Sequence, residues 1–195
     1  RRFTDLFREA ITQAELVTLN GSAPDPALDT LYRDLLDIAH ACKVPVILDA
    51  YGTIFAKALE RGPFMVKPNV EELEQFLGEH VDTREQQWRA VDRLRGGGIE
   101  LVVLSLGAEG ALVASKEGCF HARPPRIEEV NPVGSGDALV AGFALGVTQR
   151  KNLTDTIRLG VAMGTANAIT WDIGSFTRHQ VEALIPEVQL IARPV

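Results

Sequence analysis

The segment from Asn131 to Asp137 contains residue types that could carry out phosphate and proton-transfer chemistry. Gly134 and Gly136 let the backbone approach a ligand closely, and their N–H groups at the start of a helix would form a concavity for an anion. Asp137 would lie in the first helical turn, where a carboxylate can accept a hydroxyl proton as a general base. The alternative is structural, with Ser135 or Asp137 capping a helix after a glycine turn. The motif alone does not decide between these roles.

A second segment, Lys67-Pro68-Asn69-Val70-Glu71-Glu72, follows an apolar strand. Asn69 and Glu72 have the spacing of a helix capping box, and taken alone this interpretation is favoured. The alternative is a magnesium site, because Mg²⁺ usually keeps several waters and is held by one or two carboxylates. Glu72 would then orient such waters, and Lys67 would reach a phosphate. The two roles are compatible.

The third segment is Ser105-Leu106-Gly107-Ala108-Glu109-Gly110, at the end of another apolar strand. It could line the phosphates or ribose of a nucleotide, although a simple tight turn is the better interpretation of the segment taken alone. It is neither a P-loop nor the dinucleotide fingerprint, which disfavours a nicotinamide-dependent enzyme. Asn167, on a helix with small residues that favour close packing, could line an adenine pocket.

Composition excludes several classes of function. The 195 residues carry a net charge of -6 with no basic cluster, so no nucleic-acid partner is expected. No apolar run is long enough to predict a membrane span. Cys42 and Cys119 lie far apart, as expected of reduced thiols in a cytoplasmic protein. The histidines predict neither a zinc site nor a Ser-His-Asp triad.

Hydrophobic periodicity predicts alternating helices and strands. Helices are expected over residues 3–14, 28–39, 54–59, 70–77, 84–94, 136–148, 153–170 and 178–184, and strands over 16–19, 44–48, 64–66, 101–104, 111–114, 119–121 and 188–191. This order indicates an α/β fold: a mostly parallel sheet with helices on both faces and an antiparallel hairpin at one edge. Ligands of such sheets bind beyond the carboxyl ends of the strands.

The three segments follow one another along the chain as Lys67–Glu72, then Ser105–Gly110, then Gly134–Asp137. In that order they resemble the PfkB (ribokinase-like) carbohydrate kinases, from about Leu16 to Thr170. Members of that family have a Rossmann-like α/β domain with a small β-sheet lid. They transfer the γ-phosphoryl group of ATP to a sugar hydroxyl with Mg²⁺. The resemblance therefore implies ATP and Mg²⁺ as cofactors and a sugar or sugar phosphate as substrate.

The resemblance also assigns roles to individual positions. Asp137 matches the catalytic base, and Gly134, Ser135 and Gly136 match the anion hole. Glu72 matches a magnesium position that acts through water. The positions that match nucleotide-binding residues, together with the adenine-pocket candidate, are Lys67, Asn69, Ser105, Gly107, Gly110 and Asn167.

The Asn131-Pro132 dipeptide resembles the branch that contains tagatose-6-phosphate kinases and 1-phosphofructokinases, which favours a hexose phosphate such as tagatose-6-phosphate or a fructose phosphate. Two turns on the sugar side, at residues 20–24 and 49–52, depart from the usual sequences of that branch. The resemblance implies a lid and an amino-terminal sugar site, and residues 1–195 contain neither motif. We therefore expect residues 1–195 to be the carboxy-terminal nucleotide-binding and catalytic portion of such a kinase domain.

An incomplete sheet would expose an edge and an apolar face, so self-association into a homo-oligomer is expected. The alternative to a kinase is a noncatalytic nucleotide-binding remnant or regulatory module that lacks the sugar site.

Overall fold

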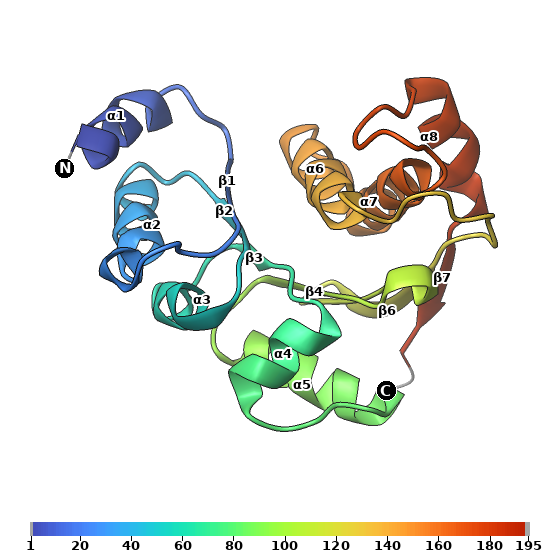
Figure 1. The fold of residues 1–195 in the computed structure, drawn as a ribbon, viewed down its shortest axis with the longest axis horizontal. Helices are drawn as coiled ribbons and strands as arrows, with labels where there is room; N and C mark the ends of the chain where they lie inside the picture. The colour runs from blue at the N-terminus through green and yellow to red at the C-terminus, as the bar shows by residue number, and fades with distance from the viewer. Residues whose placement is uncertain (1, 194–195) are drawn as a thin grey trace. The chain divides into compact units, whose positions relative to one another are not determined.

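The computed structural model describes residues 2–193, and the chain divides into two compact units, Arg1–Leu104 and Ser105–Val195 (Figure 1). Both units combine strands with helices. Among the described residues no helix is both long and apolar enough to cross a membrane.

The strands of the first unit are parallel. They are β1 (Val17–Asn20), β2 (Val46–Asp49), β3 (Met65–Val66) and β4 (Leu101–Ser105), whose last residue opens the second unit. Each strand pairs with the next along the chain, and Asn20 of β1 lies opposite Asp49 of β2. In β2 and β4 every residue but the last is buried, as expected for strands covered on both faces. The polar ends of β1 and β2 therefore meet at one edge of the sheet.

Helices lie before and between these parallel strands. They are α1 (Arg2–Ile11), α2 (Leu31–Ala41), α3 (Gly52–Leu59), α4 (Val70–Leu77) and α5 (Arg84–Gly96), with a short 3₁₀ turn η1 (Pro26–Leu28) before α2. Phe55 of α3 meets Phe76 of α4 edge to face, with ring centroids 5.3 Å apart. The predicted capping box of Thr83 and Gln86 is present at the start of α5.

The second unit contains an antiparallel hairpin, β5 (Ala111–Ser115) and β6 (Gly118–Arg123). A further strand, β7 (Gln189–Ala192), pairs antiparallel with β6, with Ile191 opposite His121. The predicted hairpin is therefore extended by the last strand of the chain. A 3₁₀ turn η2 (Gly107–Glu109) links β4 to β5, and another, η3 (Ile185–Glu187), precedes β7.

Three helices complete the second unit: α6 (Ser135–Thr148), α7 (Leu153–Ala168) and α8 (Arg178–Leu184). Helices α6 and α7 lie side by side (Figure 1). Their backbones are so close that a Cβ on Gly142 would stand 2.6 Å from the Cα of Gly160. A Cβ on Gly160 would meet the Phe143 ring at 2.5 Å. The small residues of α7 thus serve close helix packing, as predicted.

The predicted order of helices and strands is confirmed, while several element ends differ by one to three residues. The second helix was expected to start at Leu28 but starts at Leu31, because Pro26–Leu28 forms the 3₁₀ turn η1. The first helix was expected to reach Ala14 but ends at Ile11, because the N–H groups of Gln13 and Ala14 bond back to carbonyls only three residues away. Helix α7 was expected to reach Thr170 but ends at Ala168. The Ala168 carbonyl accepts hydrogen bonds from the N–H groups of Val130 and Asn131, so the helix does not continue.

Candidate active site

The predicted anion hole lies at the start of α6 in the second unit. Gly134 adopts the left-handed region with φ +82, which favours glycine. A Cβ at this position would also stand 2.5 Å from Cγ2 of Ile173, so that side chain would have to move. The Ser135 N–H donates to the Pro132 carbonyl at 3.1 Å. Within residues 2–193, the N–H groups of Gly134, Gly136 and Asp137 have no hydrogen-bond acceptor. Residues 134–137, called the cradle below, therefore offer donors to an anion.

Asp137 occupies the first turn of α6, and its side chain is exposed. It makes no hydrogen bond or ion pair with any described residue. The structural alternative, in which Asp137 caps the helix, is not what the structure shows, because Gly134 occupies the N-cap position without a side-chain cap. Position and exposure leave the carboxylate available to an incoming hydroxyl group. The role of general base stays a prediction.

The segment before the cradle is anchored to the end of α7. The carbonyl of Ala168 accepts from the N–H groups of Val130 at 2.8 Å and Asn131 at 3.1 Å. The Asn131 side chain makes two hydrogen bonds, one as a donor and one as an acceptor. Nδ2 donates to the Trp171 carbonyl at 2.9 Å, and Oδ1 accepts from the Val133 N–H at 3.1 Å. Sequence reasoning treated Asn131 only as part of a family signature and missed this anchoring role.

Asn167 is buried, with 1% of its surface exposed, and lies one residue before the end of α7. Its Nδ2 donates to the Val133 carbonyl at 2.8 Å and to Ser135 Oγ at 3.2 Å, and its Oδ1 accepts from the Gly174 N–H at 2.8 Å. In the structure the side-chain amide forms hydrogen bonds to two neighbouring loops. Contact with adenine stays a prediction.

The loop from Ser105 to Gly110 is a closed turn. The Leu106 N–H donates to the Gly110 carbonyl at 2.8 Å. Gly110 has φ +85, and a Cβ there would stand 1.9 Å from the Ala122 carbonyl oxygen of β6, so no other residue fits. Nε2 of His121, also on β6, lies 2.9 Å from the Glu109 carbonyl. The tight-turn interpretation is confirmed. Contact of Ser105, Gly107 and Gly110 with a nucleotide stays a prediction.

In the first unit, Lys67 follows β3 and is buried, with 5% of its surface exposed. Its Nζ lies 3.0 Å from Oδ1 of Asp49, the last residue of β2. The pair arises because the Lys67 N–H donates to the Leu48 carbonyl at 3.0 Å, continuing the parallel pairing beyond β3. Sequence reasoning placed both residues at strand ends but did not pair them. Whether Lys67 also contacts a phosphate stays a prediction.

Asn69 and Glu72 form a complete capping box at the start of α4. Asn69 Oδ1 accepts from the Glu72 N–H at 2.8 Å, and Glu72 Oε2 accepts from the Asn69 N–H at 2.9 Å. The capping interpretation is confirmed. The second carboxylate oxygen of Glu72 has no partner among the described residues, and the side chain is partly exposed. This arrangement fits a water-mediated magnesium ligand, because one oxygen can serve the cap while the other faces solvent.

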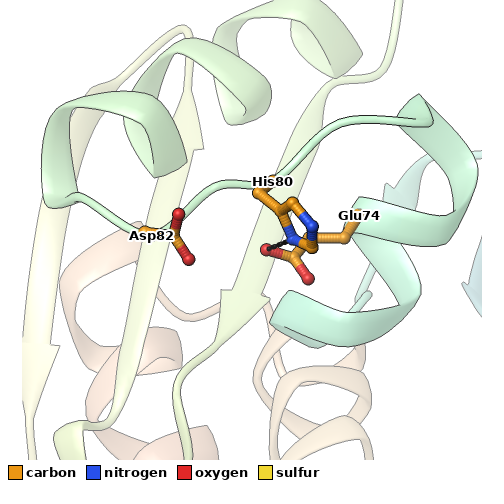
Figure 2. Close-up of side chains that lie close together, drawn as sticks. All are labelled: Glu74, His80 and Asp82. Carbon is orange, nitrogen blue, oxygen red and sulfur yellow. Dashed lines mark ion pairs between the residues drawn. The ribbon is translucent and has the colours of Figure 1, made fainter.

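A separate group in the first unit combines Glu74, His80 and Asp82, whose potential ligand atoms lie within 4.8 Å of one another (Figure 2). Glu74 Oε1 accepts from the Val81 N–H at 2.8 Å and faces Nδ1 of His80 at 3.4 Å. His80 and Asp82 are exposed. Glu74 thus holds the loop that follows Gly78, where α4 ends in the left-handed conformation. No sequence signal had grouped these three residues.

Comparison with known proteins supports the resemblance seen in the motifs. The family model "pfkB family carbohydrate kinase" matches residues 2–169. A 1-phosphofructokinase from Bacillus subtilis is 35% identical over 185 residues, which cover 93% of this chain and 59% of that protein. The chain thus spans well under two thirds of that relative.

Solved structures agree on the fold. Phosphofructokinase-2 from Escherichia coli, solved with potassium, is 26% identical with a TM-score of 0.83, over 93% of this chain and 62% of that one. The tetrameric inhibited form of the same enzyme is 26% identical with a TM-score of 0.81, over 93% and 61%. The predicted ribokinase-like α/β fold is therefore confirmed. The chain belongs to the pfkB family of carbohydrate kinases.

Proposed function

We propose that the protein transfers the γ-phosphoryl group of ATP to a hydroxyl group of a sugar phosphate, with Asp137 as the general base. One observation carries this proposal: an exposed carboxylate adjoins free backbone N–H groups at the start of α6. The donors can stabilise charge on a phosphoryl group, and the carboxylate can take the proton of the attacking alcohol.

In the proposed reaction the acceptor oxygen attacks the γ-phosphorus of ATP as the bond to the β,γ-bridging oxygen breaks. The hydroxyl proton passes to Asp137, and ADP and the phosphate ester are released. The N–H groups of Gly134 and Gly136 point their partial positive charge at the transferring group, which helps most where negative charge is concentrated in the transition state. Ser135 contributes a hydroxyl beside them. Positioning and charge stabilisation are expected to supply most of the rate.

The cofactor assignments rest on the donor sets. When bound, Mg²⁺ would neutralise phosphate charge, and Glu72 would hold it through water while still capping α4. Lys67 and Asn69 are proposed to serve the nucleotide phosphates. Ser105, Gly107 and Gly110 are proposed to contact the nucleotide, where glycine allows close approach of the backbone.

For the substrate class we propose a hexose phosphate, with fructose 1-phosphate first. The support is the family branch indicated by Asn131-Pro132 together with the 1-phosphofructokinase from Bacillus subtilis. Residues 1–195 are proposed to form the nucleotide-binding and catalytic portion of the kinase domain. A cytoplasmic location and self-association stay predictions. Because the Escherichia coli enzyme has a tetrameric form, self-association of this protein is worth testing by light scattering.

The test is a kinase assay on the full-length protein that contains residues 1–195, with ATP, Mg²⁺ and a panel of hexoses and hexose phosphates, followed by coupled detection of ADP. We expect turnover with a hexose phosphate, and ³¹P NMR of the product identifies the hydroxyl group that is phosphorylated. Asp137→Asn keeps the shape of the side chain but removes its basicity, so kcat should fall by about two to four orders of magnitude while Mg-ATP still binds.

Two results would contradict the proposal in different ways. Unchanged turnover of Asp137→Asn would refute the base assignment alone. Calorimetric binding of Mg-ATP without phosphorylation of any sugar on the panel would favour the noncatalytic nucleotide-binding alternative. Glu117→Gln is a suitable control, because it changes another exposed carboxylate of the same unit, in the turn between β5 and β6 and outside the cradle.

A further inference from the structure

Two loops of the second unit meet at a single buried side-chain amide. One loop contains Val133 and leads into the cradle, and the other runs from Trp171 to Gly174 after α7. Asn167 lies between them and bonds to both, through Val133 and Ser135 on one side and Gly174 on the other. With 1% of its surface exposed, its hydrogen-bonding groups face protein rather than solvent.

Chemistry fixes the orientation of this amide. The Gly174 N–H can only donate, so it must face Oδ1, and the Val133 carbonyl can only accept, so it must face Nδ2. An aspartate at this position would keep the bond from Gly174 but place an oxygen against the Val133 carbonyl. An alanine would remove all three bonds. The three hydrogen bonds of the Asn167 side chain, to Val133, Ser135 and Gly174, are called the bridge below. The two substitutions therefore test its two sides separately.

The bridge acts where the cradle is most constrained. Gly134, immediately after Val133, has φ +82 and lies against Ile173 of the second loop. The Asn131 side chain, which donates to the Trp171 carbonyl, ties the same two loops together a second time. A shift of either loop would therefore change the direction of the N–H groups at residues 134–137.

We propose that Asn167 is the positioning residue of the cradle: it joins the loop before α6 to the loop after α7 and so keeps the backbone donors aimed at one point. Its effect on phosphoryl transfer rests on the proposed function, whereas the bridge itself does not. Asn167 acts through Val133 and Ser135 rather than by touching adenine. This role differs from the adenine contact that was expected from its place on the helix.

The kinetic test compares Asn167→Asp with the wild-type protein. Because displaced donors fail mainly in the transition state, kcat should fall about tenfold or more while KM for ATP changes by less than about threefold. Asn152→Ala is the matched control. Asn152 caps the other end of α7 through the Asp155 N–H at 2.8 Å, so its loss weakens the same helix without touching the cradle.

Amide hydrogen exchange tests the bridge without any need for activity. The Gly174 amide should be protected in the wild type and in Asn167→Asp, and should lose protection in Asn167→Ala. The Ser135 amide donates to the Pro132 carbonyl. It should exchange faster in both variants, because loss of the donor to the Val133 carbonyl loosens the turn that contains Pro132, Val133 and Ser135. Asn152→Ala should leave both amides as in the wild type.

The outcomes distinguish this inference from the proposed function. An unprotected Gly174 amide in the folded wild type would overturn the bridge even if the protein were an active kinase. A wild-type protein that phosphorylates no sugar would contradict the proposed function, while the exchange pattern still decides the bridge. A kcat of Asn167→Asp within about twofold of the wild type would overturn the positioning role.

Discussion

Nζ of Lys67 lies 3.0 Å from Oδ1 of Asp49, and both side chains are largely buried at the ends of neighbouring parallel strands. Removing one member of a buried pair leaves the other charge without its compensation, which costs far more than loss of a surface pair. We therefore expect Lys67→Met to lower the free energy of unfolding by about 3 kcal/mol.

Urea denaturation measures this effect, and Lys57→Met provides the comparison. Lys57 also pairs with an aspartate, Asp29, but at 3.6 Å and with 35% of its side chain exposed. Its loss should cost no more than about 1 kcal/mol. Equal losses of unfolding free energy in the two variants would show that burial of the Lys67–Asp49 pair does not raise the cost of removing its lysine. Calorimetry of ATP binding to Lys67→Met tests the separate phosphate role.

A second prediction separates the two roles of Glu72. Glu72→Gln retains an Oε1 that can accept from the Asn69 N–H. Gln86 and Gln180 do the same for the N–H groups of Thr83 and Thr177 in two other capping boxes. Thermal melting should therefore show little change in stability. If Glu72 also orients waters of Mg²⁺, loss of its charge should raise the Mg²⁺ concentration needed for half-maximal rate about tenfold or more.

Glu71→Gln is the control for this experiment, since Glu71 is an exposed carboxylate in the same helical turn but takes no part in the cap. It should alter neither the melting temperature nor the Mg²⁺ dependence. Identical Mg²⁺ titrations for Glu72→Gln and the wild type would leave Glu72 as a helix cap only.

Patterns local in the chain were predictable from sequence. Apolar runs such as residues 101–104 lie in strands because they are covered on both faces, and the box of Thr83 and Gln86 needs only three residues of spacing. The glycine turn before Asp137 was predictable for the same reason. Its N–H groups lie outside the helix ladder whenever a helix starts there.

Contacts between distant residues were not predictable in this way. Asn167 meets Val133 across 34 residues, and its burial rather than its neighbours in sequence decides its role. The pairing of Lys67 with Asp49 depends on the register of two parallel strands, which no short motif encodes. Its place on a helix of small residues singled out Asn167 as a candidate, but only the geometry shows what its amide touches.

A third prediction concerns the contact between α6 and α7. Gly142→Ala would place a Cβ 2.6 Å from the Gly160 Cα and 3.0 Å from the Leu159 carbonyl oxygen, both of which are backbone atoms that cannot rotate away. The helices must separate, so we expect a loss of about 1–3 kcal/mol in the free energy of unfolding. Gly96→Ala, at the end of α5 with open space around it, should be neutral or slightly stabilising. Equal unfolding midpoints for the two variants would contradict the close packing.

The last prediction follows the hydroxyl group of Tyr32, which donates to the Asn20 carbonyl at 2.6 Å and so fixes the end of β1. Burial raises the pKa of Tyr32 above its ordinary value of 10.0. The folded protein therefore holds the phenol proton more tightly than the unfolded chain. The resulting stabilisation is complete below the unfolded pKa and is lost as pH rises through the folded one.

Tyr32→Phe should cost about 1 kcal/mol at neutral pH, because the Asn20 carbonyl loses its donor. The gap in unfolding free energy between wild type and variant should then shrink as the pH is raised from about 8 to about 11, since the wild type alone loses this contribution. Urea unfolding at several pH values measures the gap. A gap that stays constant across this range, or widens, would contradict a raised pKa of Tyr32 in the folded protein.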